Sequence, residues 1–131
     1  MNELDNKLFQ VSVKGLFFDD KGKLMMIQED NGKWELPGGR IEKGEEIIEC
    51  LARECKEELG LEVTILEKQP SIAYSVVDHA GVARIFLCYK IKFSSLDFTP
   101  NDECRAIKFF SKDEIKDLDS FPQVLKIVEY I

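Results

Sequence analysis

The feature that most constrains this chain is a helical pattern in its middle that carries three glutamates on one side. From residue 46 to 59 apolar residues recur at spacings of three and four, and Gly60 follows as the expected helix end. Glu54, Glu57 and Glu58 occupy positions i, i+3 and i+4, within an arc of roughly 100°. Their repulsion would weaken the helix by a few tenths of a kcal/mol per pair. A bound cation would offset it, whereas an ordinary solvated acidic face is the alternative.

The remaining sequence is dominated by short strand patterns. Strands are predicted at residues 9–18, 23–28, 33–36, 62–68, 71–77, 82–93 and 105–110. Two further helices are predicted, one capped by Ser111 and one starting at Ser120 and Pro122. Because strands predominate and helices interrupt and finish the chain, we expect an α/β (α+β) fold with a mixed β-sheet sandwiched between α-helices.

Two hairpin turns and one break in regular structure are predicted between these elements. Residues 19–22 are expected to close a hairpin between the first two strands, and residues 78–81 to close another. The run Pro37, Gly38 and Gly39 is expected to break regular structure and to open a polar loop before the central helix.

Size and charge limit the function classes. A chain of 131 residues with 44% hydrophobic residues fits one domain, residues 1–131. No apolar run approaches the roughly 20 residues that span a bilayer, and residues 1–7 are polar and acidic, so a cytoplasmic protein without a leader is expected. The net charge of −7 argues against stable nucleic-acid binding.

The four isolated cysteines indicate neither a zinc site nor disulfides, and we expect them to be buried thiols.

A longer pattern extends the acidic helix on both sides. Gly39 is followed after five residues by Glu45 and, after seven more, by the run Arg53-Glu54-Cys55-Lys56-Glu57-Glu58-Leu59-Gly60-Leu61. Seven fixed identities at fixed spacing arise by chance about once in 10⁸ starting points. The segment from Gly39 to Leu61 resembles the complete box of the Nudix hydrolases, MutT-like enzymes. Cys55 departs from the aliphatic residue usual there, but it is also small and apolar.

The resemblance implies a role for each matching position. Glu57 and Glu58 are expected as principal metal ligands, and Glu54 as a ligand or as the base for the attacking water. The carbonyl of Gly39 would join the metal site, while Arg53 would orient the carboxylates and Glu45 would brace the loop. Glu103 is a candidate for a further metal-binding or basic carboxylate, with Asp102 as its competitor. The expected metal is Mg²⁺, and Mn²⁺ can substitute because both accept octahedral oxygen sites.

The implied substrate is a small nucleotide. The resemblance predicts hydrolysis of the diphosphate linkage of a nucleoside diphosphate joined to a group X, which is a phosphate, a sugar or a second nucleoside. Signatures of several subfamilies, including the ADP-ribose group, are missing, and the compact size favours a nucleoside triphosphate pyrophosphohydrolase. A non-catalytic Nudix-fold binding module is the alternative. Family members often pair, so a homodimer is left open.

Two arginines are candidates for binding substrate phosphates. Arg40 directly follows Gly39, and Arg84 lies on the long strand at residues 82–93, although either can be an ordinary surface charge. Trp34 and Phe86 can stack on a base or serve the core.

Overall fold

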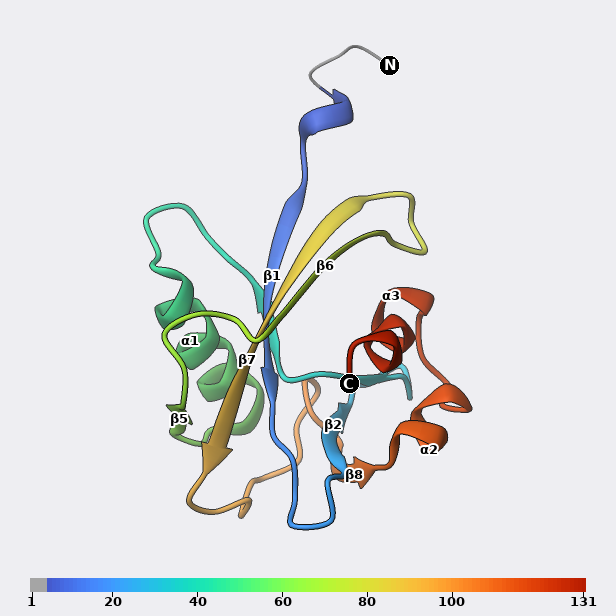
Figure 1. The fold of residues 1–131 in the computed structure, drawn as a ribbon. Helices are drawn as coiled ribbons and strands as arrows, with labels where there is room; N and C mark the ends of the chain where they lie inside the picture. Colours follow the sequence, from blue (N-terminus) through green and yellow to red (C-terminus); the bar gives the residue numbers. More distant parts are fainter. Residues whose placement is uncertain (1–4) are drawn as a thin grey trace.

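The computed structural model, which describes residues 5–131, contains two β-sheets with helices on both sides (Figure 1). Residues 1–4, part of the start expected to lack a leader, lie outside the described residues. The elements in chain order are η1 (Asp5–Lys7), β1 (Gln10–Leu16), β2 (Leu24–Gln28), β3 (Trp34–Glu35), β4 (Gly38–Arg40), α1 (Ile47–Leu59), β5 (Val63–Ile65), β6 (Ile72–Val77), β7 (Ala83–Phe93), β8 (Ala106–Phe110), α2 (Lys112–Lys116), α3 (Pro122–Leu125) and η2 (Lys126–Glu129).

The first sheet is mixed, as predicted. Its order is β4-β1-β7-β5, and β6 pairs with the part of β7 that β5 leaves free. Strands β1 and β7 run parallel, from Gln10 beside Arg84 to Leu16 beside Lys90, whereas the other pairs in this sheet are antiparallel. The second sheet, β3-β2-β8, is antiparallel throughout.

The hairpin predicted at residues 19–22 is wrong in its pairing. The turn forms, since the Asp19 N–H donates to the Lys23 carbonyl at 2.9 Å, but only a single bridge between Phe18 and Leu24 follows it. Strand β1 then continues in the first sheet while β2 enters the second. The physical reason is that β1 pairs with β7 over seven residue pairs, an arrangement that local turn chemistry does not reveal. The hairpin predicted at residues 78–81 is confirmed, because β6 and β7 pair across it.

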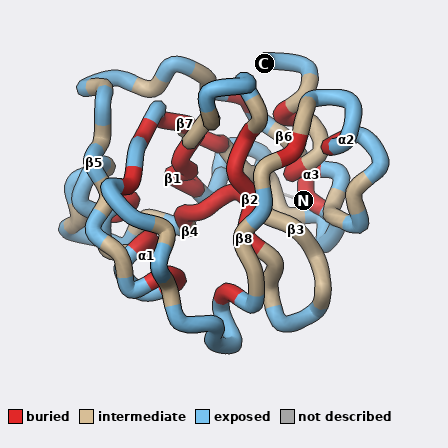
Figure 2. The backbone as a smooth tube through the Cα atoms, turned by 90° about the horizontal axis from the view of Figure 1, so that it is seen from below, coloured by how far each residue is buried: buried red, intermediate tan, exposed pale blue. Residues whose placement is uncertain are grey.

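A hydrophobic cluster lies on each side of the first sheet. One cluster packs α1 residues Leu51 and Cys55 against β1, β2 and β7, and the other packs Val124 and Ile127 of the C-terminal helices against the opposite faces of the same strands. Figure 2 shows the buried residues gathered on β1, β4, β7 and β2, with exposed residues around them. This arrangement confirms the predicted sheet between helices.

The short strand β4 is a correction to the sequence prediction, which expected a break at Gly38 and Gly39. Both glycines pair with β1, since Gly38 lies opposite Lys14 and Gly39 opposite Val13. Gly38 has φ 124°, and a Cβ there would lie 2.1 Å from the carbonyl oxygen of Val13. Glycine is required at this position because the two backbones approach so closely.

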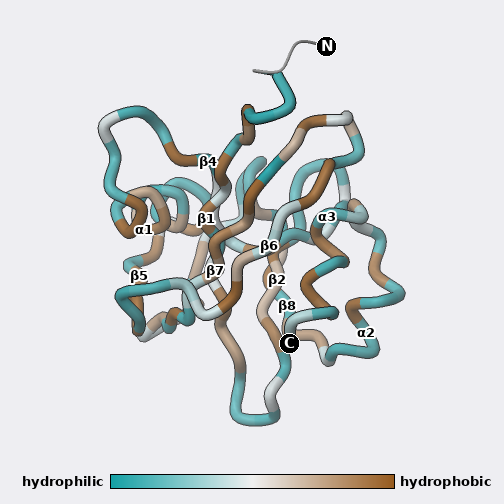
Figure 3. Tube along the Cα trace, turned by 45° about the horizontal axis from the view of Figure 1, so that its top comes forward, coloured by the Kyte–Doolittle hydropathy of each residue, from teal (hydrophilic) through white to brown (hydrophobic). Residues whose placement is uncertain are grey.

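The connection from β4 to α1 leaves the sheet and is mostly hydrophilic beyond a hydrophobic stretch next to β4 (Figure 3). The predicted central helix and its end are confirmed, with α1 ending at Leu59 and Gly60 in the left-handed conformation at φ 68°. At the C-terminus the predicted helix is short: Pro122 occupies its first turn as expected, but Phe121 rather than Ser120 is the N-cap. No helix among residues 5–131 is long and apolar enough to span a membrane.

Candidate active site

Helix α1 presents its acidic side to the sheet segment that precedes it. Cys50, Leu51 and Cys55 are fully buried in the core, so the helix can rotate little about its axis. This anchoring directs Glu54 and Glu58 toward β4. Two of the three helix glutamates, Glu54 and Glu58, therefore face the glycine-containing strand.

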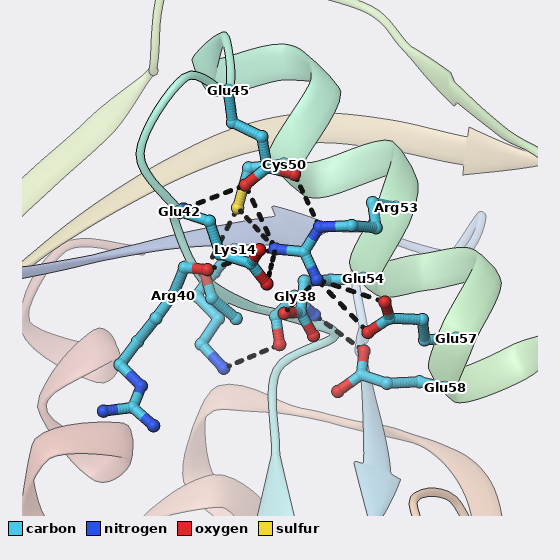
Figure 4. Close-up of polar contacts among 11 residues, drawn as sticks. Lys14, Gly38, Arg40, Glu42, Glu45, Cys50, Arg53, Glu54, Glu57 and Glu58 are labelled. Atoms are coloured by element: carbon cyan, nitrogen blue, oxygen red, sulfur yellow. Dashed lines mark hydrogen bonds and ion pairs between the residues drawn. The ribbon is translucent and has the colours of Figure 1, made fainter.

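Arg53 is the centre of the polar contacts at this end of the helix (Figure 4). Its Nε lies 2.5 Å from a Glu45 carboxylate oxygen, and its Nη1 lies 3.0 Å from Glu54 and 3.2 Å from Glu57. Its Nη2 donates to the carbonyl of Arg40 at 3.2 Å. Through these contacts Arg53 connects the loop before α1 to the acidic side of the helix.

Glu45 braces the loop that leads into α1. Its carboxylate accepts the Glu42 N–H at 3.0 Å as well as the Arg53 guanidinium. The Arg53 hydrogen bond, aided by this N–H, lowers the pKa of Glu45 to about 2. The same interaction raises the pKa of Arg53 above its usual range. Both groups are therefore charged at any pH near neutrality.

Glu58 is the most deeply buried of the helix glutamates, at 9% exposed. One of its oxygens accepts the N–H of Gly38 at 2.9 Å. Burial raises the pKa of Glu58 to about 8, although the Lys14 ammonium and the Gly38 N–H oppose that rise. Glu58 is therefore a carboxylate that gains from a nearby positive charge.

Glu54 lies directly against Gly39. A Cβ on Gly39 would be 2.4 Å from the Glu54 carboxyl carbon, so the missing side chain makes the room that this carboxylate occupies. The Gly39 carbonyl accepts the Cys50 thiol at 3.6 Å on its other side. Sequence reasoning placed Gly39 and Glu54 in one site, and the structure brings them together.

Glu54 lines three concavities: one beside Phe9, Arg40 and Glu42, and two that contain more of the predicted site residues. Of these two, the first, here called the acidic groove, has a volume of about 460 Å³ and is lined by Glu29, Asp30, Asn31, Glu54, Glu58, Asp102 and Glu103. The second, here called the basic pocket, has a volume of about 280 Å³ and is lined by Ser12, Lys14, Glu35, Gly39, Arg40, Glu54, Arg84, Phe86 and Gln123. A group bound in one concavity would therefore lie next to a group bound in the other.

Several of the site residues predicted from the sequence line one or the other of these two concavities. Glu103 lies in the acidic groove with Glu54 and Glu58, and its competitor Asp102 lines the same groove. Arg40 and Arg84 both line the basic pocket. Arg40 also donates to the Gln10 side chain at 3.1 Å, and Figure 4 shows its guanidinium directed away from Arg53.

Glu57 is separated from the other two helix glutamates. Its side chain is 48% exposed and is paired with Arg53, and it lines neither concavity. Within residues 5–131 no three histidine, cysteine or acidic side chains are grouped so that they could hold a metal ion. The three predicted ligands therefore share a helix side but do not meet at one point.

The donor set nevertheless fits a hard divalent cation. Glu54, Glu58 and Glu103 border one groove and offer only carboxylate oxygen, which Mg²⁺ prefers over nitrogen and sulfur. The missing side chain of Gly39 leaves room for the Glu54 carboxylate beside β4. Mg²⁺ commonly uses one or two protein carboxylates together with waters and substrate phosphates, so a full set of protein ligands is not required.

Several residues of the two concavities were not predicted from the sequence. In the basic pocket these are Lys14 and Glu35, which form an ion pair at 3.4 Å, with Ser12 and Gln123; in the acidic groove they are Glu29, Asp30 and Asn31. Lys14 continues the polar positions of the strand alternation at Gln10 and Ser12, so the sequence does not distinguish it from a solvent-facing residue. Of the two aromatic candidates, Trp34 packs edge-on against Phe110 in the core, whereas Phe86 is buried and also lines the basic pocket.

Comparison with known families agrees with this site. The NUDIX domain family matches residues 8–130, which include both concavities and all of α1. The chain therefore belongs to the Nudix family, hydrolases that act on phosphoric anhydride bonds.

Individual relatives support the same family. The chain is 34% identical over 111 residues to a MutT-like protein of Streptomyces ambofaciens, covering 84% of this chain and 69% of that one. It is 33% identical over 97 residues to the nucleoside triphosphatase NudI of Enterobacter sp. (strain 638), covering 67% of this chain and 68% of that one. A 53-residue match at 45% identity to the mouse 8-oxo-dGDP phosphatase NUDT18 covers 37% of this chain and 16% of that protein.

Solved structures share the fold. The crystal structure of a MutT NUDIX hydrolase from Burkholderia pseudomallei superposes with a TM-score of 0.76 at 21% identity, covering 95% of this chain and 98% of that one. At this identity the likeness concerns the fold alone.

Proposed function

We propose that this protein is a Mg²⁺-dependent nucleoside triphosphate pyrophosphohydrolase. The observation that carries the proposal is the position of Glu54, which borders both the carboxylate-lined groove and the pocket lined by Lys14, Arg40 and Arg84. A metal site beside a cationic pocket suits a polyphosphate, because the cations attract the phosphates and the carboxylates hold the metal. The similarity to a nucleoside triphosphatase supports the choice of substrate class.

The residues proposed for the metal are Glu54, Glu57, Glu58 and the carbonyl of Gly39. When bound, Mg²⁺ lowers the pKa of water and neutralises charge on a bridging phosphate oxygen, and Mn²⁺ supplies the same chemistry. Arg40 and Arg84 bind the phosphates, and Arg53 orients Glu57. Glu54 or Glu103 accepts the proton of the water that attacks phosphorus, and the bridging P–O bond breaks to give nucleoside monophosphate and pyrophosphate.

The four cysteines, all buried and unpaired, are consistent with a reducing compartment such as the cytoplasm.

The test is a hydrolysis screen with Mg²⁺ across nucleoside triphosphates, oxidised nucleotides, nucleotide sugars, ADP-ribose and dinucleoside polyphosphates. We expect pyrophosphate release from nucleoside triphosphates. Loss of a residue that only orients a metal ligand lowers activity by up to about 100-fold. Because Glu57 is proposed as a ligand itself, Glu57→Gln should lower kcat by at least that factor. Glu62→Gln is the matched control, since its carboxylate is 89% exposed and pairs only with Lys56 near the same helix.

Two results would contradict the proposal. Nucleotide binding without turnover by a folded protein would favour the non-catalytic binding module. Equal activity of the Glu57→Gln and Glu62→Gln proteins would remove Glu57 from the site.

Glu103 is the second carboxylate to test. Its side chain borders the groove, while its N–H is held by the Asn101 side chain at 2.8 Å, which fixes the backbone at this position. We expect Glu103→Gln to lower kcat by about 100-fold, the lower end for a general base, with little change in KM. Asp102→Asn tests the competing carboxylate of the same groove, and Glu62→Gln is again the control. Unchanged kcat for Glu103→Gln would exclude Glu103 from the mechanism.

A further inference from the structure

Lys14 is a buried lysine beneath the segment that carries Gly38 and Gly39. It lies on the central strand β1, is 5% exposed, and was not among the residues predicted from the sequence. Burying an ammonium group is costly unless it is paired and hydrogen-bonded, so its partners indicate what it does.

The three N–H groups of Lys14 are all directed at one segment. Its Nζ lies 3.3 Å from the Leu36 carbonyl oxygen, 3.3 Å from the Gly38 carbonyl oxygen and 3.4 Å from a Glu35 carboxylate oxygen. An ammonium group has three N–H donors and no acceptor. These contacts use all three, so Lys14 has none to offer to a substrate in the basic pocket.

The same segment holds the carboxylates of helix α1. The Gly38 N–H donates to Glu58, and Gly39 leaves the room that Glu54 occupies. The segment also joins the two sheets, because Glu35 belongs to β3 and Gly38 to β4. Figure 4 shows the Lys14 side chain reaching the segment from β1, on the side opposite Glu58.

We propose that Lys14 is a positioning residue for the metal-binding carboxylates: by holding the carbonyls of Leu36 and Gly38, it fixes the segment against which Glu54 and Glu58 rest. The assignment rests on the proposed function in so far as those carboxylates bind the metal. It concerns the geometry of the site and involves no contact with substrate.

The sign of the effect on metal affinity distinguishes this role from a purely electrostatic one. Removing a positive charge beside a cation site strengthens cation binding on Coulombic grounds. Removing an anchor that positions the ligands weakens it. Lys14→Met removes only one partner of the buried Lys14–Glu35 pair, a change that commonly destabilises a protein strongly. Circular dichroism therefore first establishes that each variant is folded.

The experiment compares Lys14→Met and Lys14→Gln with the control Lys92→Met, which removes an exposed lysine from β7. Without metal, amide hydrogen exchange is measured at Gly38 and across β7. Mn²⁺ binding to the full chain is then measured by electron paramagnetic resonance. For Lys14→Met we expect exchange at Gly38 to accelerate at least tenfold more than exchange across β7, and Mn²⁺ to bind about tenfold more weakly. Lys14→Gln, which keeps an NH₂ group with two N–H donors but loses the charge, should show smaller changes of the same sign.

Three outcomes would overturn the proposal. Unchanged or tighter Mn²⁺ binding in a folded Lys14→Met protein would show that the ammonium group acts only as a counter-charge. An equal loss of protection at Gly38 and across β7 would show that Lys14 has a general structural role. If Lys14→Met does not fold, the same exchange and Mn²⁺ measurements are made on Lys14→Gln. Effects as large in Lys92→Met would show that loss of any lysine suffices. Failure of the wild-type protein to hydrolyse nucleotides would refute the proposed function, whereas the exchange and Mn²⁺ measurements would still decide the role of Lys14.

Discussion

Arg53 shows how one side chain links the loop, the helix and the site. Its guanidinium contacts Glu45 of the loop and Glu54 and Glu57 of α1, and it donates to the Arg40 carbonyl. A guanidinium has five N–H donors in a planar fork and keeps its charge, so it can hold several oxygens in fixed relative positions. A lysine could supply the charge but not the planar geometry.

Asp78 has a comparable role for Arg84 in the basic pocket. Its side chain is fully inaccessible to solvent, accepts the Ala80 and Val82 N–H groups at 2.9 Å each, and lies 2.6 Å from the Arg84 Nε. Burial raises the pKa of Asp78, but the Val82 N–H, the Arg84 guanidinium and the Ala80 N–H together lower it below the usual value. The carboxylate thus stabilises both the hairpin turn and the position of Arg84.

We expect Asp78→Asn to destabilise the protein by about 1–3 kcal/mol at pH 7, since it weakens buried hydrogen bonds to a charged acceptor. Because the pKa of Asp78 is lower in the folded state, its contribution is fully present above the unfolded-state pKa near 4 and is lost as pH falls through the folded-state pKa. Urea unfolding at several pH values measures this. The difference between wild type and variant should shrink below about pH 4.

The control for this prediction is Asp20→Asn, a change in an exposed turn residue. Its stability should stay within about 0.5 kcal/mol of wild type. A difference between wild type and Asp78→Asn that persists unchanged at low pH would mean that the ionised carboxylate is not responsible.

At the residue level, the sequence predicts those site residues that lie close together along one helix. Glu54, Glu57 and Glu58 follow from their spacing, because helical periodicity converts sequence separation into spatial direction. Lys14, Glu35 and Gln123 come from β1, β3 and α3, which meet only through long-range pairing and packing. No local pattern encodes that meeting.

Strand β4 shows why an element can be missed for a physical reason. Glycine has low strand propensity, so Gly38 and Gly39 indicate a break when only local preference is considered. In the fold each glycine fills a different steric need: Gly38 lets β4 approach β1, and Gly39 makes room for Glu54. Helix α1 was predicted well because its end signal and apolar spacing are local, whereas the β1–β7 pairing joins residues more than 70 positions apart.

The two glycines should therefore respond differently to the same substitution. Gly38→Ala places a methyl group 2.1 Å from the Val13 carbonyl oxygen at φ 124°, so we expect a loss of about 3 kcal/mol or more in unfolding free energy. Gly39→Ala meets only the movable end of Glu54, so stability should change by about 1 kcal/mol or less. Displacing that carboxylate should nevertheless lower turnover by about 100-fold.

Urea unfolding and nucleotide hydrolysis, measured on both variants, separate the two effects. Each variant is the control for the other, because both add one methyl group to the same short strand. Full activity of Gly39→Ala would show that the position of Glu54 against Gly39 is unimportant for turnover.

At the scale of the whole molecule, the protein is acidic but its proposed phosphate pocket is not. The net charge is −7, yet Lys14, Arg40 and Arg84 line the basic pocket, with Glu35 and Glu54 as its only acidic members among the described residues. General repulsion disfavours long polyanions such as nucleic acid, whereas a small nucleotide can reach the local cations Arg40 and Arg84. Charge distribution thus supports a small substrate more than net charge alone would suggest.

The acidic groove also predicts that divalent cations stabilise the fold. A ligand that binds only the folded state adds about 2.7 kcal/mol at 100 times its dissociation constant. We therefore expect Mg²⁺ to raise the thermal midpoint of unfolding in a saturable manner, and chelation to reverse the increase.

The control is potassium chloride at the same ionic strength. It measures how far the midpoint rises when salt merely screens the repulsion within a protein of net charge −7. Glu58→Gln, which alters the buried carboxylate of the groove, should retain the potassium effect and lose most of the additional Mg²⁺ effect. If potassium reproduced the whole increase, or if Glu58→Gln kept it, the stabilisation would come from diffuse screening and not from a site on α1.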